Sequence, residues 1–123
     1  MSNKLTESIL EECHDTGLFL QESPLRVNDT NILGDSPLHL VCSWDDVEAV
    51  TALLVAGAKV NAKGDNKQTP LFRVESVQVA DLLLSAGADP TLKDEFDETA
   101  ETYLRSVGLV EVAAHIGLQA KRS

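Results

Sequence analysis

The sequence predicts an all-α fold in which short helical units stack side by side. One observation is an internal repeat, because the phrase LLVAGA at Leu53–Ala58 recurs as LLSAGA at Leu83–Ala88. A second is a matched pair upstream, SPLH at Ser36–His39 and TPLF at Thr69–Phe72. A period of roughly 30 residues is typical of solenoids, whose units bury their cores only against one another. We therefore expect one domain over residues 1–123.

Hydroxyl residues followed by proline mark where the first helix of a unit begins. A hydroxyl at the N-cap accepts a backbone N–H, and proline at the first helical position loses no needed donor. Ser36 and Thr69 are thus predicted N-caps, and Thr99 starts a third helix at the same place without a proline. In the second unit we expect one helix over about residues 37–44 and another over residues 46–56.

Glycines mark where the second helix of a unit ends. Gly57 and Gly87 follow apolar helical runs and can take the left-handed conformation that ends a helix. The polar stretch after each glycine contains Asn61 or Thr91, eight residues before the next helix start, as Asn28 stands one unit earlier. The short stretches between are predicted to project as hairpin-like loops.

This pattern resembles the ankyrin repeat, with its T-P-L-H start and its G-A-D-V-N end. The resemblance covers residues from about Val27 to Ile116 and extends more weakly to Leu5. It implies a solenoid of about four helix-turn-helix units, over residues 1–30, 31–63, 64–93 and 94–123, of which the first and last are caps. It also implies that His39 ties adjacent loops together by hydrogen bonds.

The third unit is predicted to be shortened. Twenty residues separate Pro37 from Gly57, but only 17 separate Pro70 from Gly87. We therefore expect the first helix of this unit, near residues 71–75, to be about one turn short, because three to four residues make a turn. Such a helix would notch the concave surface of the stack.

Two other departures concern a loop and the first unit. Lys67 and Asp97 replace the loop glycine Gly34, and lysine takes a left-handed conformation less readily than aspartate. The loop around Lys67 is therefore expected to differ from the others. The second helix of the first unit, over residues 18–22, is expected to be short and irregular, because Glu22-Ser23-Pro24 stands where a glycine stop belongs.

Composition excludes several classes of partner. Twenty acidic against ten basic residues give a net charge of −10, which disfavours nucleic acid and anionic membranes and fits either a basic partner or simple solubility. There is no apolar run long enough to span a membrane or serve as a signal peptide, so we expect a cytoplasmic protein. Cys13 and Cys42 show no ligand or disulfide spacing and are expected to be free, buried and reduced.

Motifs that carry chemistry are not found. No nucleophile elbow, phosphate loop or H-E-x-x-H sequence occurs, and His14 and His115 lack a second ligand at helical spacing. The acidic run at residues 94–98 lacks the spacing and central glycine of a calcium loop. We expect no enzyme activity, no cofactor and no metal.

The binding surface implied by the resemblance comprises the loop tips and the exposed side of each first helix. Ile32, Leu33, Trp44 and Phe96 are large apolar residues at such positions, and tryptophan is enriched at interface hot spots. Packing within the fold is the alternative for each of them, and Arg73 could instead form a local ion pair of little worth. The full predicted set is Ile32, Leu33, Asp35, Ser43, Trp44, Asp65, Asn66, Gln68, Arg73, Glu95, Phe96 and Glu98.

The sequence therefore indicates a monomeric, non-catalytic module that binds another protein, which its charge suggests is basic. By resemblance, a short, stand-alone ankyrin protein looks bacterial, and some such proteins are immunity proteins that neutralise a cognate toxin. A regulatory adaptor or a host-directed effector is the alternative. A small enzyme is a third class, but a stack this short offers no obvious pocket with convergent polar groups.

Overall fold

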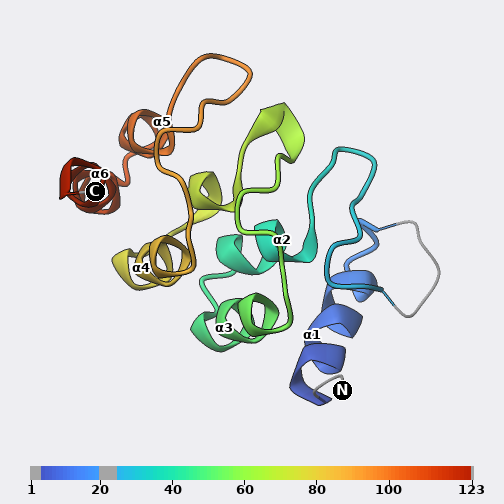
Figure 1. Cartoon of the computed structure of the whole chain (residues 1–123). Helices are drawn as coiled ribbons and strands as arrows, with labels where there is room; N and C mark the ends of the chain where they lie inside the picture. Colours follow the sequence, from blue (N-terminus) through green and yellow to red (C-terminus); the bar gives the residue numbers. More distant parts are fainter. Residues whose placement is uncertain (1–3, 20–24, 123) are drawn as a thin grey trace.

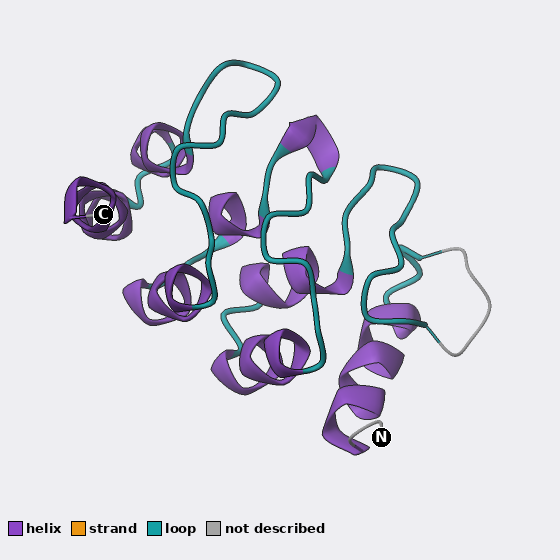
Figure 2. Cartoon of the chain, viewed as in Figure 1, coloured by secondary structure: helices purple, strands orange, loops and turns teal. Residues whose placement is uncertain are grey.

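The predicted all-α stack of helix pairs is confirmed. The computed structural model describes residues 4–19 and 25–122, and no strand occurs in these ranges. Teal loops link the helices in Figure 2 and project along one side of the stack. The elements are α1 (Lys4–Asp15), α2 (Pro37–Ser43), α3 (Val47–Val55), η1 (Asp65–Lys67), η2 (Pro70–Arg73), α4 (Val77–Ser85), α5 (Ala100–Ser106) and α6 (Val110–Arg122), where η denotes a 3-10 helix.

Two layers of helices run along the stack in Figure 1. The first helices of successive units, α2, η2 and α5, contact one another in one layer, and the second helices α3, α4 and α6 do so in the other. The core lies between these layers, where Leu38 and Leu71 of the first helices and Leu53 and Leu83 of the second are almost completely buried. The matched phrases of the sequence therefore supply equivalent core residues in adjacent units.

The repeated phrase ends each second helix in the same way. At Gly57 the backbone turns left-handed, with φ of 98°, and the N–H of Ala58 donates to the carbonyl of Leu53 at 2.9 Å. Gly87, with φ of 101°, is followed by the equivalent 2.9 Å bond from Ala88 to Leu83. This is the Schellman arrangement, in which glycine avoids the steric cost that a Cβ incurs at such φ.

Asparagines clamp each of these turns from the preceding unit. Asn28 donates its Nδ2 to the carbonyl of Gly57 at 3.1 Å and accepts the N–H of Lys59 at 2.9 Å. Asn61 forms the same two bonds one unit later, with the carbonyl of Gly87 and the N–H of Asp89. The eight-residue spacing seen in the sequence thus places an amide where it fixes one unit on the next.

Helix starts lie where predicted, but the hydroxyl caps do not all form. α2 begins at Pro37 and η2 at Pro70, yet the Thr69 side chain makes no cap hydrogen bond. The Ser36 hydroxyl lies 2.9 Å from Nδ1 of His39, whose ring also accepts the Ser36 N–H. The ring therefore takes over part of the capping at this helix, while Thr99 caps α5 as expected by accepting from the backbone of residue 102.

The shortened third unit has the predicted defect. Its first helix is the four-residue 3-10 segment η2, compared with seven residues each in α2 and α5. The ring of Phe72 in η2 is buried and lies 5.8 Å from the ring of Tyr103 in α5, centroid to centroid. An aromatic contact thus joins units three and four where the short helix offers little other surface.

The first unit contributes one helix that contacts both layers. α1 contacts α2 and α3 alike, and it lies at the end of the stack in Figure 1. Residues 18 and 19, part of the predicted second helix, are not helical, and the rest of that prediction lies outside the described residues. The four unit boundaries themselves stay predictions.

His39 and Gly64 form the joint between units two and three. Because a carbonyl can only accept, Nε2 of His39 carries the proton that it donates to the carbonyl of Gln68 at 2.9 Å. The backbone of Gly64 lies against this ring, so an added Cβ would overlap Oδ1 of Asp35 and lie 2.8 Å from Nε2. Burial lowers the pKa of His39 from 6.5, although the Gln68 carbonyl and the Asp35 carboxylate oppose that shift.

We predict that the joint makes the fold sensitive to acid. Because the pKa of His39 is lower in the folded than in the unfolded state, the unfolded chain binds the proton more readily, and stability is lost as the pH falls below 6.5. The midpoint of urea unfolding should fall between about pH 7.5 and pH 5 and fall less in His39→Gln. An equal fall of the urea midpoint with pH in the wild type and in His39→Gln would contradict this.

We also predict that Gly64→Ala destabilises the protein by about 2–3 kcal/mol, because the methyl group overpacks the joint. Thermal melting checks this, with Lys63→Ala, an exposed neighbour, as the control expected to change little. An unchanged melting temperature for Gly64→Ala would show that the joint can widen at no cost.

Candidate protein-binding surface

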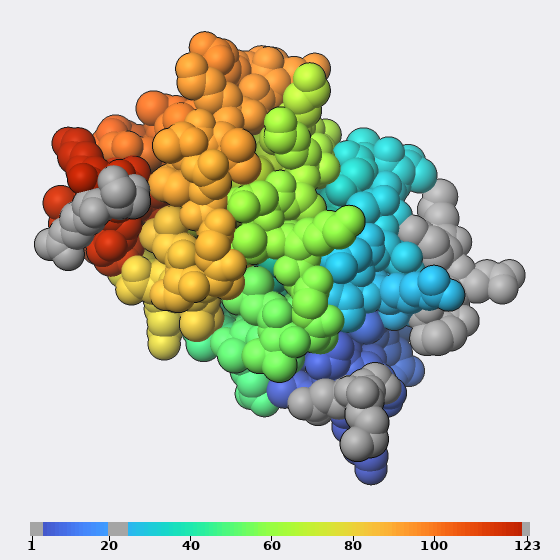
Figure 3. Space-filling view, in the orientation of Figure 1, coloured from blue at the N-terminus to red at the C-terminus, as the bar shows by residue number. Residues whose placement is uncertain are grey.

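Three loops project beside one another, and each is closed by the same backbone bond. The N–H groups of Asn31, Gly64 and Asp94 donate to the carbonyls of Asp35, Gln68 and Glu98 at 2.8–2.9 Å. Residues 32–34, 65–67 and 95–97 therefore form the tips. Figure 3 shows the tips as neighbouring ridges along one edge of the molecule.

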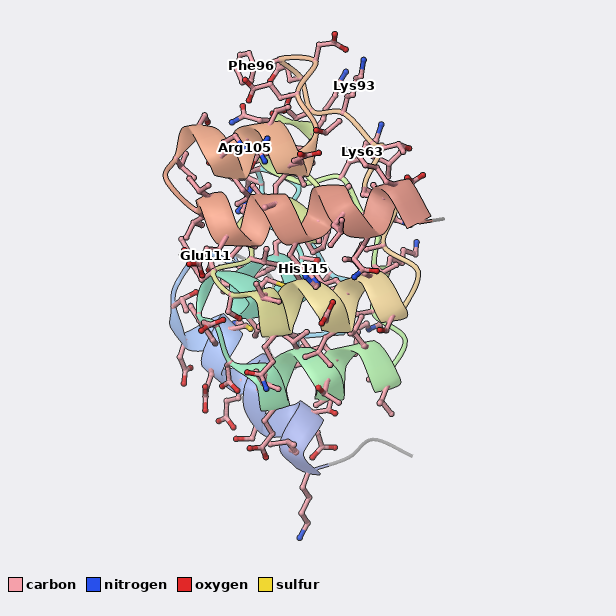
Figure 4. All side chains as sticks on the ribbon, turned by 90° about the vertical axis from the view of Figure 1, so that its left-hand side faces the viewer. Lys63, Lys93, Phe96, Arg105, Glu111 and His115 are labelled. Carbon is pink, nitrogen blue, oxygen red and sulfur yellow. The ribbon has the colours of Figure 1, made fainter. Side chains whose placement is uncertain are left out.

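Apolar side chains are exposed at both ends of this row of tips. Ile32 and Leu33 are 81% and 56% exposed on the first loop, and Phe96 is 67% exposed on the last. Figure 4 shows Phe96 at the upper edge of the molecule, with Lys93 on the same loop. The structure thus places these residues at the surface, but the intervening polar tip separates them, and they do not form a single cluster.

Trp44 lies at the far end of α2 from the loop. It follows the last residue of that helix and is 39% exposed, so part of its surface remains available to a partner. Asp45, which follows it, adopts a left-handed conformation with φ of 57°. The neighbouring Ser43 is exposed, but its hydroxyl donates to the carbonyl of Leu40 at 2.6 Å and is thus engaged within its own helix.

Three residues of the predicted binding set instead form contacts between the repeat units. Asp35 and Gln68 are 7% and 5% exposed, because they stand at the loop bases. Arg73 forms a bidentate ion pair with Asp35 at 3.1 and 3.3 Å, and its Nε donates to Oε1 of Gln68 at 3.1 Å. Arg73 therefore forms an ion pair, as the alternative interpretation had it, but the pair is not local in the sequence, because it links two units across 38 residues.

The middle loop differs from its neighbours, as expected. Asn66 and Lys67 are both left-handed, with φ of 57° and 60°, whereas only Gly34 and only Asp97 are so in the other two loops. The N–H of Asp65 donates to Oδ1 of Asp35. The middle tip is therefore tied to the loop before it.

The tips also link forward, since the N–H of Glu95 donates to the carbonyl of Asn66 at 2.8 Å. Lys67 and Asp97 also lie at the tips, whereas Gln68 and Glu98 of the predicted set lie at the loop bases. The positions of the loop glycine and its replacements were the signal for these tip residues.

Lysines interrupt the acidic character of the tips. Lys63 and Lys93 flank the middle and last loops, Lys67 lies on a tip, and Lys93 pairs with Asp97 at 3.4 Å. The acidic excess lies elsewhere, because residues 1–62 carry ten acidic and three basic residues, whereas residues 63–123 carry ten and seven. The half of the chain that contains Ile32, Leu33 and Trp44 thus has a net charge of −7 and the other half −3.

Reactive chemistry is poorly supported at this surface. In the described residues no group of three or more metal-ligating side chains comes together. Cys13 and Cys42 are free, and burial raises the pKa of each thiol to about 12, which keeps both protonated at neutral pH.

Among the described helices none is long and apolar enough to cross a bilayer.

The family assignment follows from comparison with known proteins. The family described as ankyrin repeats (3 copies) matches residues 4–94, which is most of the chain. The chain belongs to the ankyrin-repeat family. Ankyrin repeats are protein-interaction modules, generally without catalytic activity of their own, and the exposed tips and first-helix surface fit such a role.

Two curated ankyrin proteins show moderate similarity. A putative E3 ubiquitin-protein ligase, XBAT34 of Arabidopsis thaliana, is 38% identical over 90 residues, which cover 68% of this chain and 24% of the relative. The human ankyrin repeat and SOCS box protein 16 is 37% identical over 94 residues, which cover 74% and 19%. The chain therefore spans a quarter or less of the length of either relative.

We predict that the ion pair between Asp35 and Arg73 couples the two ankyrin units by about 2 kcal/mol, as hydrogen bonds to charged groups do. A double-mutant cycle with Asp35→Asn and Arg73→Met measures that coupling from urea unfolding. The exposed pair of Glu101 and Arg105, one turn apart on α5, is the control, with an expected coupling of about 0.4 kcal/mol. Equal coupling for the two pairs would refute this role.

Proposed function

We propose that the protein binds another protein through its loop tips and the exposed side of its first helices. The observation that carries this is the exposure of Ile32, Leu33, Phe96 and Trp44 in a chain that buries Phe19 and Phe72 and half-buries Tyr103. Solvent-exposed aromatic and branched side chains cost solubility, and aromatic residues are enriched at interfaces. Asp65, Asn66, Glu95 and Glu98 complete the polar rim, together with Lys67 and Asp97.

A basic partner fits the charge of the N-terminal half. An acidic surface around Trp44 and the first loop would attract a basic protein at long range and raise its association rate. The lysines near the other two tips would contribute less to this steering. We also propose that the protein binds its partner as a monomer in the cytoplasm, without catalysis and without a cofactor.

Two biological settings agree with this binding mode. In the first, the protein is an immunity protein that neutralises a basic bacterial toxin, a role that rests on the acidic charge of the chain. In the second, it is an adaptor that recruits a target, which the names of the relatives favour, since these include a ubiquitin ligase and a SOCS box protein. Binding to a purified basic toxin with loss of toxicity would support the first, and recruitment of a ligase together with its target the second.

We predict that Trp44→Ala and Phe96→Ala each weaken partner binding about tenfold, as interface anchors do, while the melting temperature changes by no more than about 2 °C. A partner recovered by cross-linking in cells and then purified permits the affinity measurement by calorimetry. Leu118→Ala, at an exposed site on the second helix α6, is the binding control.

Leu53→Ala is the stability control and should cost about 2–5 kcal/mol, because it opens a cavity in the core. The proposed surface is wrong if Trp44→Ala and Phe96→Ala destabilise the fold as much as Leu53→Ala does. It is equally wrong if they leave the affinity unchanged.

A further inference from the structure

A second surface lies between α1 and α3, among the helices and away from the projecting loops (Figure 1). It is a groove of about 720 Å³. Its apolar lining comes from α1, from residue 27 near the end of the first unit, and from α3 with its C-terminal end: Leu5, Leu10, Val27, Ala52, Val55 and Ala56. Val55 is 84% exposed, the largest value among the exposed apolar side chains of the described residues.

The groove lies where the stack would seat another helix. In the second layer α3 packs beside α4, and α4 beside α6, so α3 and α4 each have a helical neighbour on the side of the next unit. Among the described elements, the helix that α3 contacts on the side of the first unit is α1, which contacts α2 as well. Part of the α3 surface around Val55 stays exposed beside α1.

Charge indicates what kind of helix would fit. Glu7 of α1 and Glu48 of α3 line the groove from opposite walls, and Arg26 is the single basic residue among its described lining. The surrounding half of the chain carries the net charge of −7. A helix that places apolar side chains over Val55 and Ala52, and lysines or arginines at the rims of the groove, would match both the apolar lining and the acidic charges.

We propose that this groove binds an amphipathic helix of a partner protein, apolar on one face and basic at its flanks. The helix adds itself to the second layer beside α3, as α4 does on the other side. This surface is separate from the loop tips, so it can bind its helix while the tips hold another protein, or it can add a second contact to the same partner.

The test uses two labelled peptides of about 14 residues, long enough for nearly four turns. Both carry leucines at helical spacing, and the remaining positions are lysine in one and glutamate in the other. Fluorescence anisotropy measures their affinities for the wild-type protein, for Val55→Arg in the groove and for Val107→Arg as the matched control. Both positions are exposed, so circular dichroism and melting curves should match the wild type. Thr51→Arg, on the same wall, serves as a second groove variant.

We expect the lysine peptide to bind the wild type at least about tenfold more tightly than the glutamate peptide, and Val55→Arg and Thr51→Arg to weaken it about tenfold, a loss of about 1.4 kcal/mol. Val107→Arg should change its affinity by less than about twofold. Equal weakening by Val107→Arg would mean non-specific attraction, and equal binding of both peptides would remove the charge argument. A concentration-dependent mass in sedimentation that Val55→Arg abolishes would assign the groove to a second copy of the chain. Each of these three results overturns the proposal.

Discussion

The structure depends on a fixed step from one unit to the next. Asn28 and Asn61 each hold the turn at the end of the following second helix, at Gly57 and Gly87, by one donated and one accepted bond. Since no unit buries its core alone, that step must be the same along the chain or the layers of leucines would not meet. At the corresponding third place Thr91 bonds Asp89 instead.

The turns at Gly57 and Gly87 repeat, but the contacts between successive units differ. Units two and three are joined by polar groups: Arg73 pairs with Asp35, which also accepts the N–H of Asp65, and His39 donates to the carbonyl of Gln68. Units three and four are joined by the packed rings of Phe72 and Tyr103. This contact requires no hydrogen-bonding partner in a particular protonation state. The joint that uses buried polar groups is the more specific, because each of them must find its partner.

The sequence predicted most of the frame because the frame repeats. Helix starts at Pro37 and Pro70, the ends at Gly57 and Gly87, and the short η2 all followed from local chemistry or residue counting. The surface was harder to predict. The burial of Asp35 depends on Arg73, 38 residues away, and a contact at that distance leaves no periodic signal. Likewise, the groove beside α3 depends on how α1 packs against both α2 and α3, which no motif marks.

The uneven charge has a consequence for how the molecule meets its surroundings. A net charge of −7 on one half of an elongated stack and −3 on the other gives the protein an electric dipole along its long axis. In the field of a basic protein such a dipole experiences a torque, so the stack turns its N-terminal end forward before any side chains touch. Salt screens the electric field of the partner over roughly 10 Å, so the ionic strength would determine how strongly the approach is oriented.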